Sequence, residues 1–243
     1  MSLDHRRPLL ATEYVVHHLD RVASTQDEAR ERYAGVPCLV TAGEQAAGRG
    51  RSGTGWLNAP RALAASLAFQ PDWPPARIPL LTLVAGLAAR RVLGAALQLK
   101  WPNDVVTAAG DKVAGLLAER TGPVVVIGLG ANLFWPDPPD GVAAMSATDP
   151  GPTASQTLAV DWAESLLAAV EAGPGDWGAG VYRSCSATIG TDITWDGGGP
   201  GKAVDIDEDG GLVVQAAAGL VTLRSGRVHS VRPTTLPTEQ EDD

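Results

Sequence analysis

The sequence predicts an α+β fold that ends in a small β-barrel. Two long stretches have helical spacing of apolar residues, and a series of short apolar runs between them indicates consecutive strands. After Cys185 the chain carries only short strands, separated by Gly and Asp turns. Its 243 residues fit one large domain, with or without a small appendage, and can bury a core without disulfides.

The N-terminal third predicts one helix and two strands. Ser24 is a typical helix start, because two acids follow it in the first turn, and Gly35 ends the helix. The strands are expected at 36–41 and 63–69. The segment 43–59 between them is rich in glycine and has no periodicity, so it indicates a loop.

The middle of the chain predicts two helices that flank a group of strands. Apolar residues recur at helical spacing over 78–93 and again over 154–172, where Gly173 ends the second helix. Four apolar runs between turn residues are expected to be strands, at 97–101, 104–107, 112–119 and 124–133. The glycine-rich segment 173–180 that follows the second helix is expected to be a hinge or loop.

The C-terminal part changes in composition and predicts a separate unit. Its short strands are expected at 192–195, 203–207, 212–215, 220–223 and 228–231. Glu208-Asp209-Gly210-Gly211 is a strong hairpin signal between two of them. We therefore expect a catalytic domain over 1–184, a small β-barrel over 185–233 and an acidic tail without fixed structure over 234–243.

Composition excludes several classes of function. The net charge of −9 gives no overall field for nucleic acid or anionic membranes, so any anion site must be built locally. The longest uncharged run, 121–136, is interrupted by Gly and Pro and is too short for a membrane span. The N-terminus has no signal-peptide pattern, and two cysteines suit a reducing compartment. We expect a cytoplasmic protein without membrane or nucleic-acid partners.

One segment, residues 48–56, concentrates glycine and arginine. Four of its first eight residues are Gly, and Arg49 and Arg51 lie among them in an acidic protein. Glycine lets the backbone approach a ligand closely, and arginine binds carboxylate or phosphate in two-point fashion. The segment therefore indicates a site for an anionic small molecule, although a surface loop or an RNA-binding patch has the same composition.

Three later segments carry polar residues at strand ends. In Lys100-Trp101-Pro102-Asn103-Asp104 the last two side chains fit an ordinary turn, or Asp104 binds a cation such as Mg²⁺. Lys112 begins an apolar strand, where it guards a sheet edge or stabilises developing negative charge. The Gly128-Leu129-Gly130-Ala131-Asn132 run weakens a strand unless a group approaches it closely.

The order and spacing of these segments resemble biotin protein ligase, the biotin–acetyl-CoA-carboxylase ligase family. The resemblance extends from about Ser24 to Pro233 and depends most on GRGR at 48–51 and KWPND at 100–104. It implies a catalytic domain built around a mixed sheet of the biotin/lipoate ligase type, followed by an SH3-like barrel.

The resemblance also implies roles for individual residues. Biotin-binding residues are expected to be Ser24, Thr25, Gln26, Gln45, Arg49, Gly50, Arg51, Lys112, Gly115 and Gly128. Nucleotide-binding residues are expected to be Trp56, Lys100, Asn103, Gly130 and Asn132, with Asp104 as the metal ligand. Lys112, Arg49 and Arg51 are expected to be catalytic.

The implied activity is that of an ATP-dependent ligase. Biotin reacts with ATP and Mg²⁺ to give biotinyl-5′-AMP, and a lysine of a biotin carboxyl carrier domain then displaces AMP. Arg49, Lys112 and Mg²⁺ would offset the repulsion between the two anionic substrates, so no enzyme nucleophile is required. The family contains monomers and homodimers, and one sequence does not distinguish them.

Two departures from the family pattern bear on function. Ser52 and Thr54 stand where basic residues are common, so the loop is expected to hold the adenylate less firmly. Only 23 residues precede Ser24, too few for the helix-turn-helix that some members carry, so we expect no repressor activity.

Three alternatives remain. A lipoate ligase or octanoyl transferase has the same fold, but the latter needs a nucleophile and Cys38 lies in an apolar strand. A non-enzymatic RNA-binding module conflicts with the net charge of −9, because an acidic protein does not attract a polyanion. A metal hydrolase needs a cluster of metal ligands, which the four histidines are not expected to form. Adjacent His17 and His18 would point to opposite faces of a strand.

Overall fold

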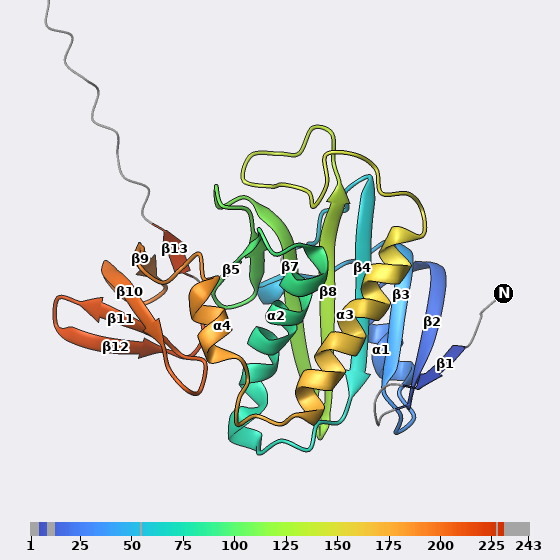
Figure 1. Ribbon diagram of the computed structural model, residues 1–243, viewed down its shortest axis with the longest axis horizontal. Coiled ribbons are helices and arrows are strands. Elements are labelled where there is room, and N and C mark those ends of the chain that lie inside the picture. The colour runs from blue at the N-terminus through green and yellow to red at the C-terminus, as the bar shows by residue number, and fades with distance from the viewer. Residues whose placement is uncertain (1–4, 9–12, 54, 227, 231–243) are drawn as a thin grey trace, which may run out of the picture.

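The computed structural model describes residues 5–8, 13–53, 55–226 and 228–230. A large mixed sheet forms the body of the molecule, and a smaller antiparallel sheet lies at one end of it (Figure 1). The α+β class predicted from the sequence is confirmed. Within the described ranges, none of the helices is both long and apolar enough to cross a membrane.

The large sheet has eight strands in the order β1-β2-β3-β4-β8-β7-β6-β5. Its strands are β1 (His5–Pro8), β2 (Glu13–Val22), β3 (Cys38–Gln45), β4 (Arg61–Phe69), β5 (Gln98–Lys100), β6 (Asp104–Val106), β7 (Lys112–Thr121) and β8 (Val124–Phe134). Among the strands that the structure describes, only β2 and β3 pair in parallel, and the helix between them makes the crossover that a parallel pair requires.

Helices cover the two faces of this sheet unequally. Figure 1 shows α2 (Leu81–Leu93) and α3 (Ala154–Glu171) lying across one face, and a short 3₁₀ helix, η2 (Pro75–Leu80), leads into α2. On the other face α1 (Thr25–Arg32) packs against β3, β4 and β8. The rest of that face is left to the loop 48–56, which contains the 3₁₀ turn η1 (Arg51–Gly53).

Strand periodicity separates the two faces. Leu39 and Ile127 join the main core beneath α2 and α3, whereas Val40 and Val126, one residue along, join a small cluster around Ala29 of α1. Burying a side chain of this size contributes about 1.5–3 kcal/mol, so the larger cluster provides most of the stability. The α1 face is held by fewer apolar contacts.

Small residues on the α1 face of the central strands leave room there. Gly128 of β8 pairs with Ser66 of β4 and Leu117 of β7, and Gly130 pairs with Gly115 of β7. Their neighbours on the opposite face, among them Leu116, Ile127 and Leu129, are buried in the main core, so the helix side of the same strands is packed. The glycines within these strands therefore produce a hollow on one face only.

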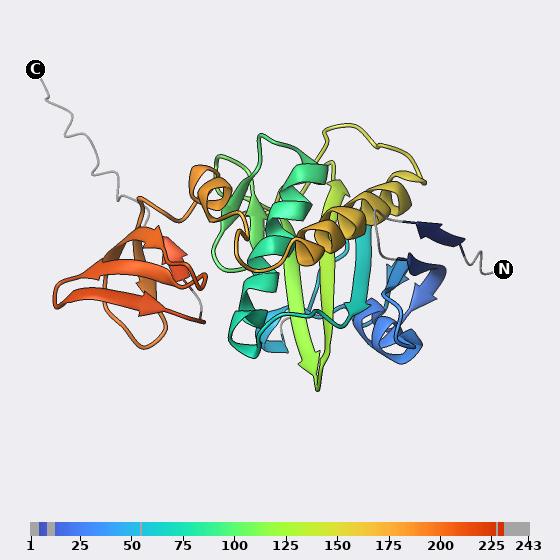
Figure 2. The ribbon, with the colours of Figure 1, turned by 60° about the horizontal axis from the view of Figure 1, so that its bottom comes forward.

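The small sheet follows a short helix, α4 (Ala179–Ser184). Its strands pair in the order β12-β11-β10-β9-β13, and all pairs are antiparallel. They are β9 (Asp192–Trp195), β10 (Gly201–Ile206), β11 (Leu212–Ala216), β12 (Gly219–Leu223) and β13 (Val228–Ser230). Figure 2 shows this curled sheet as a distinct lobe beside the large one.

Most predicted elements are present, with ends shifted by a few residues. The strand expected at 36–41 begins at Cys38 and runs on to Gln45, inside the expected loop. Strand β2 was not expected, because only Tyr14 and Val16 show clear apolar alternation before polar residues follow. Helix α4 begins at Ala179, inside the segment 173–180 that was expected to be a hinge or loop. The acidic tail expected over 234–243 lies outside the described residues.

Candidate active site

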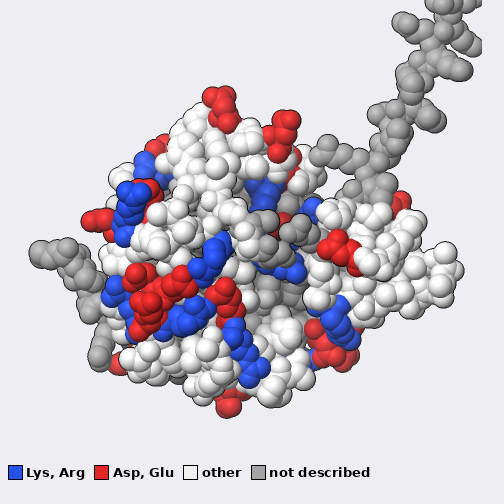
Figure 3. All heavy atoms as spheres, turned by 180° about the vertical axis from the view of Figure 1, so that it is seen from behind, with Lys and Arg blue, Asp and Glu red and all other residues white. Residues whose placement is uncertain are grey.

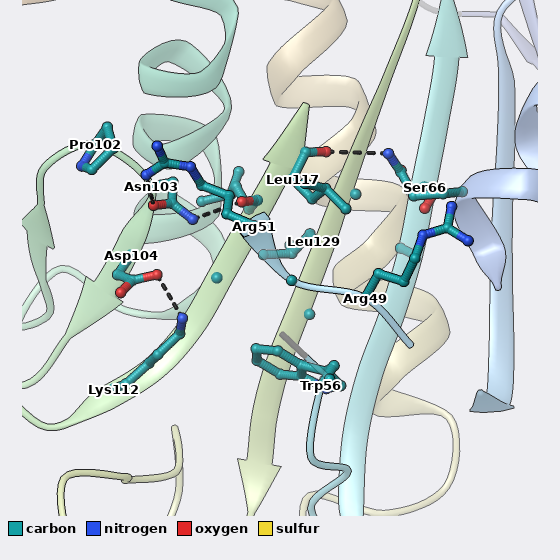
Figure 4. Close-up of a pocket in the computed structure, with 18 of the residues that line it drawn as sticks. Arg49, Arg51, Trp56, Ser66, Pro102, Asn103, Asp104, Lys112, Leu117 and Leu129 are labelled. Carbon is teal, nitrogen blue, oxygen red and sulfur yellow. Dashed lines mark hydrogen bonds and ion pairs between the residues drawn. The ribbon is translucent and has the colours of Figure 1, made fainter. Parts of the chain in front are cut away.

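A cavity of about 310 Å³ lies on the α1 face of the large sheet. Its floor is formed by β4, β7 and β8, and its walls by the start of α1, the loop 48–56 and the segment 100–104 (Figure 4). Segments far apart in the sequence therefore meet in one hollow. Fifteen of the sixteen predicted site residues line it: Ser24, Thr25, Gln26, Gln45, Arg49, Gly50, Arg51, Trp56, Lys100, Asn103, Asp104, Lys112, Gly115, Gly128 and Gly130.

The end of the cavity beside α1 is lined by uncharged polar groups. The backbone N–H and the hydroxyl of Thr25 both donate to Oε1 of Gln45, over 2.9 and 3.0 Å. Thr25 Oγ1 also lies 2.8 Å from Ser66 Oγ. Because these groups fix one another before any ligand arrives, this end is suited to a neutral ligand with both donors and acceptors.

Gln26 presents an unused acceptor at the same end. Its Nε2 donates to the carbonyl oxygens of Leu117 and Val126 over 3.4 Å, and the side chain is almost fully buried. Oε1 is buried and has no hydrogen-bond partner among the described residues. A Cβ on Gly128 would come within 2.8 Å of this oxygen. A buried acceptor without a donor is costly, so it marks a place where a ligand N–H fits.

Trp56 covers the glycines of the sheet floor. A Cβ on Gly130 would lie 2.8 Å from Cε2 of the indole, and one on Gly115 would lie 3.4 Å from Cζ3. The backbone N–H of Trp56 donates to the Gly48 carbonyl over 2.9 Å, which closes the base of the loop 48–56. The ring reaches the sheet only because those two strand positions lack side chains.

Lys112 and Asp104 form an ion pair at the opposite end of the cavity. Lys112 Nζ lies 2.6 Å from Asp104 Oδ1 and 5.8 Å from the centre of the Trp56 ring. Figure 4 shows the two side chains pointing toward each other from adjoining strands. This end therefore combines a cation, a carboxylate and an aromatic face, a set that suits a nucleotide phosphate with its metal ion.

Arg49 is directed away from that charged end. Its two terminal nitrogens donate to the two carboxylate oxygens of Asp27 on α1, each over 2.8 Å, and one lies 3.9 Å from Glu119. The guanidinium holds the pKa of Asp27 below its usual range, and the carboxylate raises the pKa of Arg49. The loop is thus tied to the helix that carries the uncharged end of the site.

Arg51 turns the other way. It donates from NH1 to Asn103 Oδ1 over 3.0 Å and from NH2 to the Gly226 carbonyl over 3.4 Å. Asn103 in turn donates to the Leu116 carbonyl over 2.8 Å. The two arginines of one loop therefore reach opposite walls of the cavity. The side chain of Ser52 and all of Thr54 lie outside the described residues.

Asn132 is the predicted site residue that the cavity does not include. Its Nδ2 donates to the Ala143 carbonyl over 3.0 Å, and its backbone carbonyl accepts from the Met145 N–H, while its buried Oδ1 has no hydrogen-bond partner among the described residues. Asn132 thus helps to hold the long loop after β8, and its predicted contact with the nucleotide stays a prediction.

Several lining residues were not predicted. Ser66, Leu117 and Leu129 come from the strands of the floor, and His229 comes from the small sheet. Ser66 and Leu117 could have been found, because Ser66 sits inside an apolar strand and Leu117 is two positions from Gly115. Leu129 could not, because it lies one position from Gly128 and Gly130 and its side chain belongs to the main core. His229 has no such signal, since only the packing of the two sheets brings it near.

Metal-ligand and nucleophile arrangements are sparse. The described residues contain no group of three or more His, Cys, Asp or Glu side chains able to hold a metal ion. Cys38 and Cys185 are both buried, neither lines the cavity, and burial raises the pKa of Cys185. Asp104 is the carboxylate among the lining residues, and Mg²⁺ is commonly held by one carboxylate together with substrate phosphates.

Charges on this face are mixed. Viewed from behind, Lys and Arg side chains lie among Asp and Glu side chains (Figure 3). One example is the ion-pair group of Arg30 and Arg49 with Asp27 and Glu119. A surface of alternating sign attracts a polyanion weakly, which argues against the RNA-binding alternative.

The chain has clear similarities to known proteins. Residues 18–132 match the profile of the Biotin/lipoate A/B protein ligase family, and residues 200–229 match the Biotin protein ligase C terminal domain. A biotin–[acetyl-CoA-carboxylase] ligase of Mycobacterium tuberculosis is 35% identical over 213 residues, which cover 80% of this chain and 79% of that protein. One from Paracoccus denitrificans is 36% identical over 148 residues, 56% and 59% of the two chains.

Solved structures show the same similarity. The chain superposes on the biotin protein ligase from Aquifex aeolicus in complex with biotin and ATP with a TM-score of 0.72 and 25% identity. The match covers 89% of this chain and 98% of that one, so it includes both sheets.

Proposed function

The chain belongs to the biotin/lipoate A/B protein ligase family, and within it we propose a biotin protein ligase that acts in two steps. In the first, biotin and ATP give biotinyl-5′-AMP and pyrophosphate. In the second, a lysine of a biotin carboxyl carrier domain takes the biotinyl group and releases AMP. The convergence of four distant segments on one cavity, polar and uncharged at one end and charged at the other, carries this proposal.

The uncharged end suits the ring system of biotin. The ureido group of biotin offers two N–H donors and one carbonyl acceptor. The free Oε1 of Gln26 is an acceptor for one of those donors, and Ser24 and the linked Thr25 and Gln45 lie beside it. Gly128 keeps this space open, because a side chain there would collide with Gln26.

The charged end suits the reacting groups. One oxygen of the biotin carboxylate attacks the α-phosphorus of ATP, and pyrophosphate leaves with its bonding electrons. Both partners are anions, so Lys112 would stabilise the charge that develops on the phosphoryl oxygens. Asp104 is the side chain that would hold Mg²⁺, which arrives with the triphosphate and supplies charge neutralisation when bound.

The loop 48–56 would retain the intermediate. Biotinyl-5′-AMP is a mixed anhydride that water hydrolyses, so the site must exclude water until the acceptor arrives. Arg49 and Arg51 fasten the loop to both walls of the cavity, and Trp56 offers an aromatic surface to the adenine. The acceptor lysine then attacks the acyl carbon, loses a proton and expels AMP.

The test is a reconstituted reaction. The full chain is mixed with biotin, ATP and Mg²⁺ and with the carrier domain of a biotin-dependent carboxylase, and mass spectrometry follows the acceptor. We expect a mass gain of one biotinyl group on a single lysine, dependent on ATP. A parallel reaction with lipoate in place of biotin separates the two substrates of the family. If the carrier domain were modified by lipoate and not by biotin, the proposal would be refuted.

A further inference from the structure

The two sheets are joined at the active-site segment through one buried residue. Trp101 is only 3% exposed, and it lines the cavity together with Pro102, Asn103 and Asp104, which follow it. Its indole Nε1 donates to the carbonyl oxygen of Gly210 over 3.0 Å. Because Gly210 lies in the turn between β10 and β11, this bond runs from the active-site segment to the small sheet.

The backbone of Trp101 makes a second link in the same direction. Its N–H donates over 2.9 Å to Oγ1 of Thr188, which is 2% exposed and lies between α4 and β9. Just before it, Leu99 N donates to the Cys185 carbonyl and Ala187 N donates to the Leu99 carbonyl, both over 2.8 Å. The segment 185–188, which leads into the small sheet, therefore runs beside β5 and is hydrogen-bonded to both Leu99 and Trp101.

The turn that accepts the indole bond is firmly held. Gly210 has a φ of +78°, and a Cβ there would lie 2.7 Å from Leu83 Cδ1 and 2.8 Å from Leu80 Cδ2. Asp207 Oδ1 accepts from the N–H groups of Asp209 and Gly211 over 3.0 and 2.8 Å. A turn fixed by its own hydrogen bonds and by contact with α2 is a rigid support for Trp101.

We propose that Trp101 is a positioning residue through which the small sheet holds the segment 102–104 for adenylate formation. This proposal rests on the function proposed above. Asn103 binds Arg51 and Asp104 binds Lys112, so a shift of the segment displaces the cationic side chains of Arg51 and Lys112. A misplacement of about 1 Å can cost roughly a hundredfold in rate, so two hydrogen bonds from Trp101 to residues outside the cavity can affect the chemical step.

The chain supplies a matched control in Trp177. Its Nε1 donates over 3.0 Å to the carbonyl of Glu208, in the same turn that binds Trp101. Trp177 is 6% exposed and does not line the cavity. Trp177→Phe therefore removes the same kind of bond from the same turn, but leaves the active-site segment untouched.

The experiment compares Trp101→Phe, Thr188→Val and Trp177→Phe in the full chain. Biotin-dependent exchange between ATP and pyrophosphate measures adenylate formation, and transfer from added biotinyl-5′-AMP to the carrier domain measures the second step. We expect Trp101→Phe and Thr188→Val to lower the exchange kcat about tenfold and to leave the transfer step within about twofold of wild type. Trp177→Phe is expected to keep both rates while losing a similar amount of Tm.

Each other outcome has a clear meaning. If Trp101→Phe loses no more exchange activity than Trp177→Phe at equal loss of Tm, Trp101 is only structural and the inference is wrong. If Trp101→Phe does not fold, Thr188→Val, a smaller change at the same link, decides the question alone. If the wild-type chain itself catalyses no biotin-dependent exchange, the proposed function fails instead.

Discussion

Arg49 and Asp27 form a two-point ion pair, in which both terminal guanidinium nitrogens lie 2.8 Å from carboxylate oxygens. The pair joins the loop 48–56 to α1 at the residue directly after Gln26. One loop arginine therefore secures the loop to the uncharged end of the cavity, while Arg51 secures it to the charged end. Retention of an adenylate between the two ends should depend on both attachments.

Asp27→Asn tests the first attachment. The two side chains are about 40% exposed, and an ion pair of this kind contributes at most about 1 kcal/mol, or roughly fivefold. We expect biotinyl-5′-AMP to dissociate up to about fivefold faster from the variant, measured by release of radiolabelled adenylate. Glu28→Gln is the control, because Glu28 pairs with Arg32 on the same helix and not with the loop. An equal effect of both variants would contradict this role.

The same pair predicts a pH dependence. Because Arg49 lowers the pKa of Asp27 in the folded protein, the pair contributes fully above the ordinary carboxyl value of 3.8 and is lost as the pH falls through the lowered pKa. Hydrogen exchange of residues 48–53 should therefore not change between pH 8 and 5 once corrected for intrinsic rates, and protection should fall only below about pH 4. In Asp27→Asn that acid step should be absent.

The floor glycines predict a separation of the two substrates. Gly128→Ala would place a methyl group 2.8 Å from Gln26 Oε1, so we expect it to weaken biotin binding at least tenfold in calorimetry. Gly130→Ala would place one 2.8 Å from the Trp56 ring and should instead raise the KM for ATP. Gly180→Ala has no neighbour within 4 Å and lies in α4, so it should change neither value. Equal effects of the first two variants on both substrates would contradict this division.

Lys112→Met removes the cation that pairs with Asp104 at the charged end. Loss of one donor at a developing oxyanion typically lowers kcat by about a hundredfold to a thousandfold, and we expect a fall of this size in ATP–pyrophosphate exchange. Lys202→Met is the matched control, because Lys202 is exposed on β10 and does not line the cavity. Exchange above one tenth of the wild-type rate in Lys112→Met would exclude a catalytic role for this lysine.

Arg51→Gly removes the second attachment of the loop. The Asn103 side chain loses its donor, and the adenylate should escape and label lysines on bystander proteins such as serum albumin. Western blotting with streptavidin measures this labelling. Arg21→Gly is the control, since Arg21 pairs with Glu44 at an exposed position outside the cavity. Labelling equal to that of the control would remove Arg51 from its assigned role.

The sequence by itself determined the family and most of the residues that line the candidate site. Glycine and arginine at 48–51, the KWPND segment at 100–104 and the strand glycines have special chemical or conformational properties, and the family match confirms the resemblance drawn from them. The α+β class followed from the periodicity of apolar residues, which reflects the faces that elements bury. These are local properties, and they can be read without knowing which strand lies beside which.

Only the tertiary structure decided how those residues meet. Strand pairing placed Gly128 beside Ser66, and packing of the small sheet brought His229 to the cavity and Gly210 to Trp101. A hydrogen bond from Asn132 Nδ2 to the Ala143 carbonyl joined Asn132 to the loop after β8. The opposite directions of Arg49 and Arg51 depend likewise on Asp27 and Asn103, which are distant in sequence. Contacts between remote segments leave no periodic trace in the chain, because each partner is compatible with many neighbours until the fold selects one.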